Sequence, residues 1–101
     1  MKFEWDPNKN EINFTQHRVR FEEAETVFED ERSIIIYDED HSDDEDHSDD
    51  EDRFLIIGIS SILRELTVCY CCRNGDEITR IISARRATKK ESMIYERGLR
   101  L

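Results

Sequence analysis

The first feature that the sequence lacks is a long apolar run. A transmembrane helix takes about 20 consecutive apolar residues, and no stretch of this 101-residue chain approaches that length. The opening residues, MKFEWDPNKN, also lack the apolar core of a signal peptide. We therefore expect a cytoplasmic protein with no membrane segment.

Cysteine is scarce, and its distribution does not suit a disulfide framework. Cys69, Cys71 and Cys72 lie within four positions of one expected strand, and an odd, clustered set favours reduced thiols. The histidines His41 and His47 are conceivable further zinc ligands. Alternation along the strand, however, puts Cys72 on the face opposite Cys69 and Cys71, so we expect buried thiols and no metal site.

Basic residues are missing from residues 38–52, DEDHSDDEDHSDDED, which hold eleven carboxylates, two histidines and two serines. This acidic segment dominates the formal net charge of -10, because residues 1–37 carry -4 and residues 53–101 carry +5. Without the segment the chain is nearly neutral and its C-terminal half is basic. The overall acidity therefore does not exclude a polyanionic partner.

The acidic segment contains a tandem copy, since SDDEDH at 42–47 recurs as SDDED at 48–52. Adjacent carboxylates repel and no apolar residue is present, so neither a helix nor a strand is expected. A calcium site is a possible alternative, but the glycine of EF-hand loops is absent. We expect a mobile, solvated loop within one domain that spans residues 1–101.

The N-terminal part of the chain predicts a strand and two helices. KFEW alternates as a short strand, and Asp6-Pro7 then starts a helix over residues 7–16, with Ile12 its clearest apolar residue. RFEEAETVFED, residues 20–30, predicts a second helix. Its apolar residues recur at helical spacing and are Phe21, Ala24, Val27 and Phe28.

The rest of the chain is rich in strand-forming residues. SIIIYD, at 33–38, is a β-branched run that leads into the acidic segment, and RFLIIGIS, ELTVCYCCR and ITRIISAR follow it with short links. A final helix has a capping box between Thr88 and Glu91 and stops at Gly98. We expect an α+β fold, a small antiparallel sheet with packed helices, in the order β-α-α-β-β-β-α.

Arginines gather around the expected meander. Guanidinium groups recognise phosphate in a bidentate manner, although each arginine could instead pair with a surface acid. The alternation of side chains along a strand adds a condition. Arg80 and Arg85 fall on opposite faces of a regular strand, so a site that includes both requires a bulge between them. The candidates are Arg53, Arg73, Arg80, Arg85 and Arg86.

The first predicted helix offers a second group of candidates. His17 ends this helix and could accept a proton from a ribose 2′-hydroxyl, or could cap the helix dipole instead. Lys9, Asn13 and His17 follow each other at i, i+4 and i+8. They form either a polar strip beside the sheet or a solvated face.

Three segments of the sequence together resemble the BrnT family of ribonuclease toxins. They are FEWDPNKN with NFTQHRVRFEEAETVFED, DHSDDEDR followed by IGISS, and RIISARRATKKESMIYE. The similarity runs from Phe3 to about Glu96, and its most specific part is RIISAR followed by Glu91 and Tyr95. It implies a RelE-like toxin fold and cleavage of RNA without a cofactor.

The resemblance also implies partners and site residues. The partners are RNA and a cognate BrnA-type antitoxin with a ribbon-helix-helix half, so that DNA is contacted only through the antitoxin complex. We expect Arg53, Arg73 and Arg85 to contact phosphate, and His17 or Glu91 to carry the proton. Lys9 and Arg80 would contact the RNA backbone, while Tyr95 matches the family motif but also suits core packing.

The chain departs from the family pattern at two places. Arg18 follows His17 where the family usually has glycine, so the helix cap falls on a residue less suited to the left-handed conformation. The acidic loop is duplicated where the family has a single copy. A rival interpretation is a non-catalytic, acidic protein-binding module whose loop mimics nucleic acid.

Overall fold

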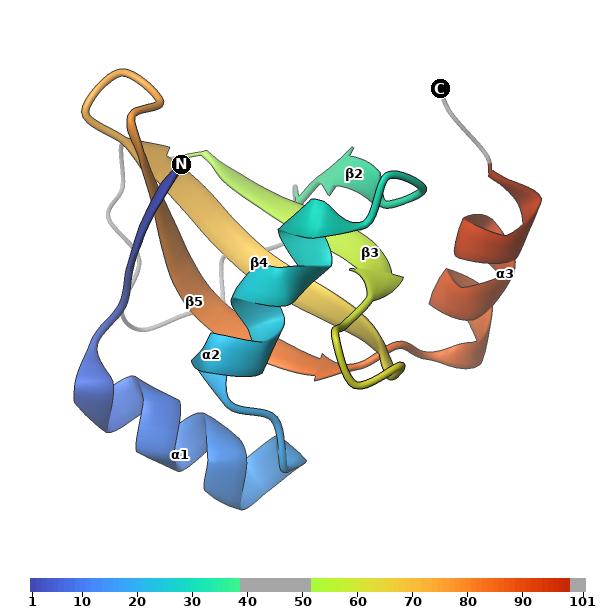
Figure 1. The fold of residues 1–101 in the computed structure, drawn as a ribbon, viewed down its shortest axis with the longest axis horizontal. Coiled ribbons are helices and arrows are strands. Elements are labelled where there is room, and N and C mark those ends of the chain that lie inside the picture. The colour runs from blue at the N-terminus through green and yellow to red at the C-terminus, as the bar shows by residue number, and fades with distance from the viewer. Residues whose placement is uncertain (39–51, 99–101) are drawn as a thin grey trace.

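A computed structural model describes residues 1–38 and 52–98 of the chain. Within them, five strands form one sheet in the order β1-β5-β4-β3-β2 (Figure 1). The strands are β1 (Lys2–Glu4), β2 (Ile34–Tyr37), β3 (Arg53–Ile59), β4 (Glu65–Arg73) and β5 (Ile78–Arg86). The mobile loop expected in the acidic segment falls on residues 39–51, outside the described residues.

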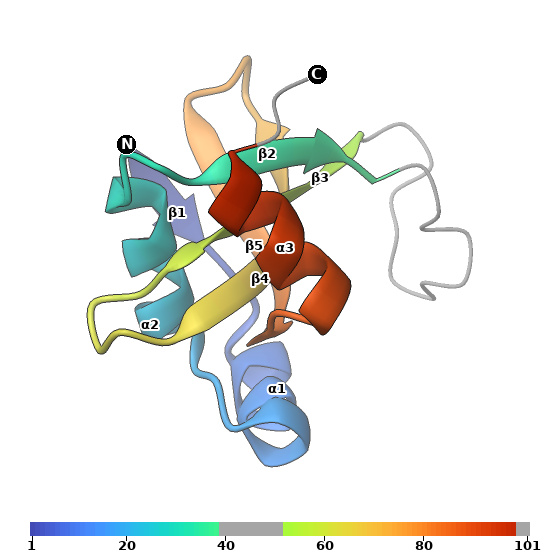
Figure 2. The same cartoon turned by 90° about the vertical axis from the view of Figure 1, so that its right-hand side faces the viewer.

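The helices cover both faces of this sheet. They are α1 (Pro7–His17), α2 (Phe21–Ala24), the 3-10 helix η1 (Glu25–Glu29) and α3 (Lys89–Arg97). α2 and α3 lie on opposite sides of the sheet (Figures 1 and 2). In the described part of the chain no helix has the length and apolar character that a membrane crossing requires.

The α+β class and the antiparallel meander β3-β4-β5 are confirmed. The β-branched run predicted at residues 33–38 forms β2, which pairs antiparallel with β3, so the predicted order β-α-α-β-β-β-α counts one strand too few. β1 pairs parallel with β5, a contact between distant parts of the chain that the meander did not predict. This pairing brings the N-terminus beside the last strand.

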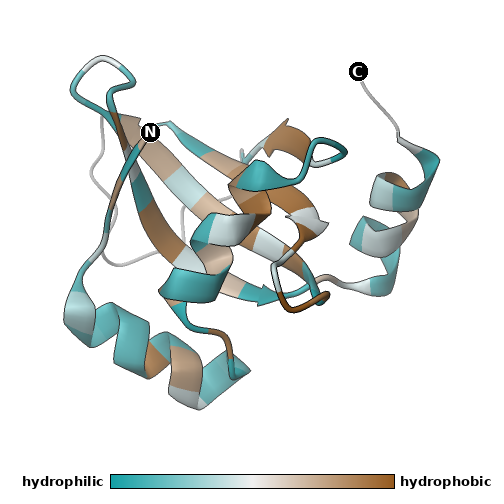
Figure 3. Cartoon of the chain, viewed as in Figure 1, coloured by the Kyte–Doolittle hydropathy of each residue, from teal (hydrophilic) through white to brown (hydrophobic). Residues whose placement is uncertain are grey.

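One face of the sheet, called the core face below, packs against α2 and η1. Phe3 and Trp5 of the N-terminal segment join it through edge-on ring contacts with Phe28 and Phe21. Apolar residues concentrate in the strands and polar ones in the helices (Figure 3). The buried core consists of Val19, Phe21, Ala24, Val27, Ile56, Leu66, Val68, Tyr70, Ile81 and Ala84.

The second predicted helix is shorter than expected. α2 ends at Ala24 and continues as the tighter η1. The predicted stripe is nevertheless buried at Phe21, Ala24 and Val27, and Phe28 packs against the core. Both forms of helix carry the stripe to the core face of the sheet.

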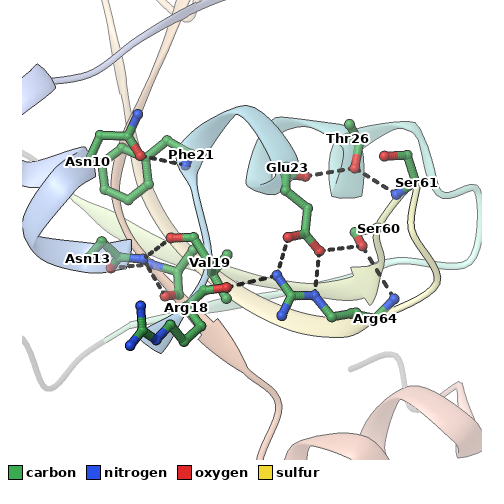
Figure 4. A network of polar contacts seen from close by, with 11 residues as sticks. Asn10, Asn13, Arg18, Val19, Phe21, Glu23, Thr26, Ser60, Ser61 and Arg64 are labelled. Carbon is green, nitrogen blue, oxygen red and sulfur yellow. Dashed lines mark hydrogen bonds and ion pairs between the residues drawn. The ribbon is translucent and has the colours of Figure 1, made fainter. Parts of the chain in front are cut away.

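Ile12, the clearest apolar residue of α1, is exposed. α1 instead buries Asn10 and Asn13. Asn13 donates to the carbonyls of Val19 and Ala84 and accepts from the Ala84 N–H, so its amide pairs with the edge of β5 beyond β1 (Figure 4). Strand-edge groups need partners, which explains why an amide is buried here.

A second group of polar contacts, after those of Asn13, connects α2 to the turn between β3 and β4 (Figure 4). Glu23 accepts hydrogen bonds from the guanidinium of Arg64 and from the hydroxyl of Ser60, and Arg64 also donates to the Arg18 carbonyl. The contacts of Asn13 and those of Glu23 and Arg64 together hold the segment between α1 and α2 against the sheet.

Four helix and turn features confirm the sequence-based predictions. Asp6 caps α1 by accepting from the Asn8 N–H, and the Thr88–Glu91 capping box starts α3. The β4–β5 turn takes positive φ at Asn74, Gly75 and Asp76. Gly98 ends α3 with φ 63°. All four depend on neighbours close in sequence, which makes them predictable.

The α1 cap generates a stability prediction. Arg18 has φ 58° and ψ 31°, a left-handed conformation that costs a side-chain-bearing residue about 1 kcal/mol relative to glycine. Arg18→Gly should therefore raise the free energy of unfolding by about 1 kcal/mol, measured by urea titration. Arg18→Ala is the matched control, because it removes the guanidinium and keeps the strain. Equal stability of the two variants would contradict the strain argument.

Candidate functional site

A bulge in β5 determines which arginines share a face. Tyr70 pairs with Ile81 and Cys69 pairs with Ser83, so Ile82 has no partner across β4. The extra residue shifts the alternation of side chains by one. Arg80 and Arg85 consequently lie on the same face, opposite the core face. The bulge that the sequence required for a shared site is therefore present.

The face opposite the core face is called the arginine face, after its residues Arg53, Arg73, Arg80 and Arg85. The strand register aligns one row across it: Glu4 lies opposite Arg80, Arg80 opposite Cys71, and Cys71 opposite Arg53. Adjacent strands are about 4.8 Å apart, so Arg80 and Arg53 are separated by about 10 Å at their Cα atoms. Four strands thus contribute to one row.

One end of this row is a shared ion pair. Arg80 Nη1 donates to Glu4 Oε2 at 2.8 Å, and Arg73 Nε lies 3.8 Å from the same oxygen. All three side chains are partly exposed, at 36% for Glu4, 29% for Arg80 and 43% for Arg73. The carboxylate therefore holds two guanidinium groups together at the surface.

Arg85 lies on the same face, four residue pairs further along β4 and β5, where it pairs with Thr67. Its Nη1 and Nη2 donate to the two carboxylate oxygens of Glu91, at 2.7 and 2.9 Å. Glu91 also accepts from the Thr67 hydroxyl and the Thr88 N–H. This network attaches the N-terminus of α3 to the middle of the sheet.

The same hydrogen bonds determine the ionisation of Glu91. Burial alone would raise the pKa of Glu91, but the bonds from Arg85, Thr88 and Thr67 outweigh it and lower the pKa to about 2. A carboxylate with so low a pKa is a weak base at neutral pH. Glu91 therefore suits the placing of Arg85 better than proton transfer.

Tyr95 provides the second attachment of α3, which has no buried residue of its own. Its hydroxyl donates to Asp30 Oδ2 at 2.6 Å, and burial together with this bond raises the pKa of Tyr95 to about 12. Asp30 also accepts from the Ile59 N–H. The hydroxyl thus has a structural partner, in agreement with the packing interpretation of the sequence.

Cys69 and Cys71 are buried on the arginine face, whereas Cys72 packs against the core, as alternation predicted. The Cys69 thiol contacts Asp38 Oδ2 at 3.9 Å. Burial, followed by the charge of Asp38, raises the pKa of Cys69 to about 11. A thiol with this pKa is protonated and unreactive at neutral pH.

The two candidates on α1 lie apart from the row. His17 is exposed at the end of the helix, and Lys9 is partly buried one turn before Asn13. Asn13, between them, is bonded to β5, so the strip borders the edge of the sheet. Within the described residues no hydrogen bond or ion pair joins His17 to an arginine.

The structure thus brings together Arg53, Arg73, Arg80, Arg85 and Glu91 on one face. Arg86 points to the opposite side, toward Glu23 of α2. Sequence reasoning missed Glu4. Its only signal was alternation in KFEW, which puts Glu4 on the face opposite Phe3 and Trp5, but the partner strand could not be identified from a three-residue strand.

Among residues 1–38 and 52–98, no three His, Cys, Asp or Glu side chains gather closely enough to hold a metal ion. The histidines His41 and His47, considered above as zinc ligands, lie outside these ranges. The chemistry of the described face comes from guanidinium and carboxylate groups.

Comparison with known proteins agrees with the fold and identifies a family. The family model described as ribonuclease toxin, BrnT, of type II toxin-antitoxin system matches residues 5–91. Among solved structures, the chain is similar to the Brucella abortus ribonuclease toxin BrnT, solved at 1.1 Å. The identity is 22%, the TM-score is 0.63, and the match covers 88% of this chain and 99% of that one. At this identity the likeness shows the fold. No curated protein matches the chain.

The Glu91 network generates a pH prediction. The pKa of Glu91 is about 2 in the folded protein and 4.5 ordinarily, so folding stabilises the ionised form. This contribution, about 3 kcal/mol, is fully present above pH 5 and is lost as the pH falls toward 2. Glu91→Gln, which can keep the capping box, should make stability less dependent on pH in that window.

The measurement is urea unfolding at a series of pH values from 7 to 2. Glu96→Gln, a change at an exposed glutamate of the same helix, is the matched control and should follow the wild-type curve. Identical curves for wild type and Glu91→Gln would contradict the assigned network.

Proposed function

The chain belongs to the BrnT family of ribonuclease toxins of type II toxin–antitoxin systems, and on this basis we propose that it is a metal-independent endoribonuclease. The observation that supports the proposal is the gathering of Arg53, Arg73, Arg80 and Arg85 on one face of the sheet. The proposed substrate is a single RNA phosphodiester together with the 2′-hydroxyl beside it.

The proposed reaction begins with attack of the 2′-oxygen on phosphorus. Such a reaction needs a base for the hydroxyl proton, cations for the phosphorane and a proton for the leaving 5′-oxygen. Arg73, Arg80 and Arg85 expose about a third or more of their side chains and can contact the phosphate. Arg53 is 4% exposed, so its positive charge would act on the phosphate from below the protein surface.

Fixed guanidinium groups can stabilise the phosphorane without a metal. Glu4 and Glu91 hold Arg80 and Arg85 in place before substrate arrives, and preorganised charges avoid a reorganisation cost during the reaction. Lys9, at the edge of the sheet, would contact the RNA backbone. His17 stays a candidate proton carrier, from a position outside the row.

The family implies an antitoxin partner and an RNA target. We propose in addition that the antitoxin is of the BrnA type, with a ribbon-helix-helix half through which the complex contacts DNA. Cleavage of cellular RNA would arrest growth and would take place in the cytoplasm.

The rival function, a non-catalytic protein-binding module, draws on the net charge of -10 and the eleven carboxylates of the acidic segment. It requires no cleavage of RNA by the purified protein. Cleavage in the presence of EDTA therefore separates the two.

We predict that the purified protein cleaves RNA in EDTA and that Arg85→Ala lowers the rate by about 100-fold or more, because a cation is lost from the phosphate site. Rates come from single-turnover cleavage of a labelled RNA. Arg20→Ala is the matched control, since Arg20 is also paired to a glutamate, Glu11 at 3.0 Å, but lies outside the sheet as the N-cap residue of α2.

Thermal unfolding must show that Arg85→Ala remains folded at the assay temperature. Wild-type rates in folded Arg85→Ala would remove this residue from the site. No cleavage by the wild type would support the binding module.

A further inference from the structure

Among the described residues, Glu4 combines an oxygen that accepts no hydrogen bond with direct contacts to two arginines of the arginine face. Its Oε2 accepts from Arg80 and lies near Arg73. No group among the described residues bonds to Oε1. The side chain is 36% exposed, so solvent and substrate can reach that oxygen.

Arg80, the partner of Glu4, is also only partly used. Nη1 is bonded to Glu4, while Nε and Nη2 have no partner among the described residues. A guanidinium carries five N–H donors in a fixed plane. The open carboxylate oxygen and the open donors thus belong to two side chains that are joined by the 2.8 Å hydrogen bond from Arg80 Nη1 to Glu4 Oε2.

We propose that Glu4 is the general base of the ribonuclease and that Arg80 holds the phosphate next to the hydroxyl that Glu4 deprotonates. This inference rests on the proposed function. A base must lie within hydrogen-bond reach of the proton it abstracts, and the paired side chains put a base and a phosphate ligand within one nucleotide of each other.

In the proposed reaction, Glu4 Oε1 takes the 2′-hydroxyl proton while the 2′-oxygen forms a bond to phosphorus. The bond from phosphorus to the 5′-oxygen breaks, and this oxygen takes a proton from water to leave as an alcohol. The hydroxide so formed removes the proton from Glu4. The products are a 2′,3′-cyclic phosphate and a 5′-hydroxyl end, and no oxidant or further reactant is needed.

Three other carboxylates on this face suit the role less well. Glu65 lies at the far end of β4, and among the described residues no arginine is bonded to its side chain. Both oxygens of Glu91 are occupied, by donors from Arg85, Thr67 and Thr88. Asp38 is adjacent to Arg53 through its backbone N–H and accepts from the Cys69 thiol, at the end of the row away from Arg80. Among the described residues, only Glu4 is bonded to the guanidinium of Arg80, whose Nε and Nη2 are open.

Basic side chains lie close to Glu4. Arg80 of β5 and Arg73 of β4 are within 4 Å, and Lys2 precedes Glu4 by two residues on the same strand. A general base acts only in its unprotonated form, so the proposed reaction should slow at acid pH.

The test is Glu4→Gln, in which the amide oxygen can still accept from Arg80. We predict a fall in the single-turnover rate of about 100- to 10,000-fold and loss of the acid limb of the pH–rate profile. The products of the wild type should end in a cyclic phosphate. Binding of a non-cleavable 2′-O-methyl oligonucleotide should be undiminished, which shows that the variant is folded and that the phosphate site is intact.

Glu11→Gln is the matched control, because it also removes a carboxylate from an arginine pair, at Arg20. It should leave the rate and the profile unchanged. Asp38→Asn is the rival variant and should retain the acid limb.

Three results would overturn the inference while leaving the proposed function intact. They are wild-type cleavage by Glu4→Gln, a slower Glu4→Gln with an unchanged acid limb, and loss of that limb in Asp38→Asn instead. The second result would make Glu4 a positioning residue for Arg73 and Arg80. An inactive wild type would overturn the proposed function together with the inference.

Discussion

The bulge at Ile82 is the constraint on which the arrangement of this protein depends. β5 must present Ile81 and Ala84 to the core face, since both are buried there, and a regular strand would put these residues on opposite faces. One unpaired residue lets both side chains enter the core. The same shift moves Arg80 and Arg85 to the other side together, so burial of apolar side chains on one face sets the positions of charged ones on the other.

The two faces of the sheet are stabilised by different interactions. The core face gains from apolar burial against α2 and η1, and its open edge at β5 is closed by the amide of Asn13. The arginine face is held by charge-assisted hydrogen bonds, from Arg80 to Glu4 and from Arg85 to Glu91. Like charges on one face repel, and the two carboxylates offset that repulsion while fixing each guanidinium in place.

The overall charge of the protein conceals this division. The acidic segment holds eleven of the chain's carboxylates, and without it the other residues carry a net charge near zero. A cationic face and an anionic segment therefore belong to the same small protein. The anionic segment would compete with RNA for the cationic face most strongly at low salt, where charges interact over a longer range.

Local sequence patterns were sufficient for much of the fold. The capping box at Thr88, the Asn74-Gly75 turn and the β-branched runs each depend on neighbours within a few residues, and each is present in the structure. The pairing of β1 with β5 joins residues more than 70 positions apart, and nothing in KFEW specifies that partner. The same limit hid Glu4, whose role arises only when Arg80 lies beside it.

The site could be predicted in part, for the same reason. The arginines were identified by their chemistry. The alternation of side chains along a strand indicated that Arg80 and Arg85 could share a face only if a bulge lay between them, but it did not give the position of the bulge. Asn13 was placed on a polar strip, yet its burial depends on an unpaired edge of β5 that only the sheet order reveals. The apolar character of Ile12 gave no indication of the buried side of α1, because α1 meets the sheet through the hydrogen bonds of Asn13, and Ile12 is exposed.

The central claim, that one face of the sheet is a cradle for RNA phosphate, can be measured directly by NMR of arginine side chains. A 2′-O-methyl oligonucleotide, which binds without being cleaved, would be titrated into protein labelled with nitrogen-15 while the arginine Nε–H signals are followed. The account predicts that the signals of Arg80 and Arg85 shift together and saturate at one concentration, while that of Arg20 stays in place. Shifts confined to Arg20 and Arg18, with Arg80 and Arg85 unmoved, would contradict it.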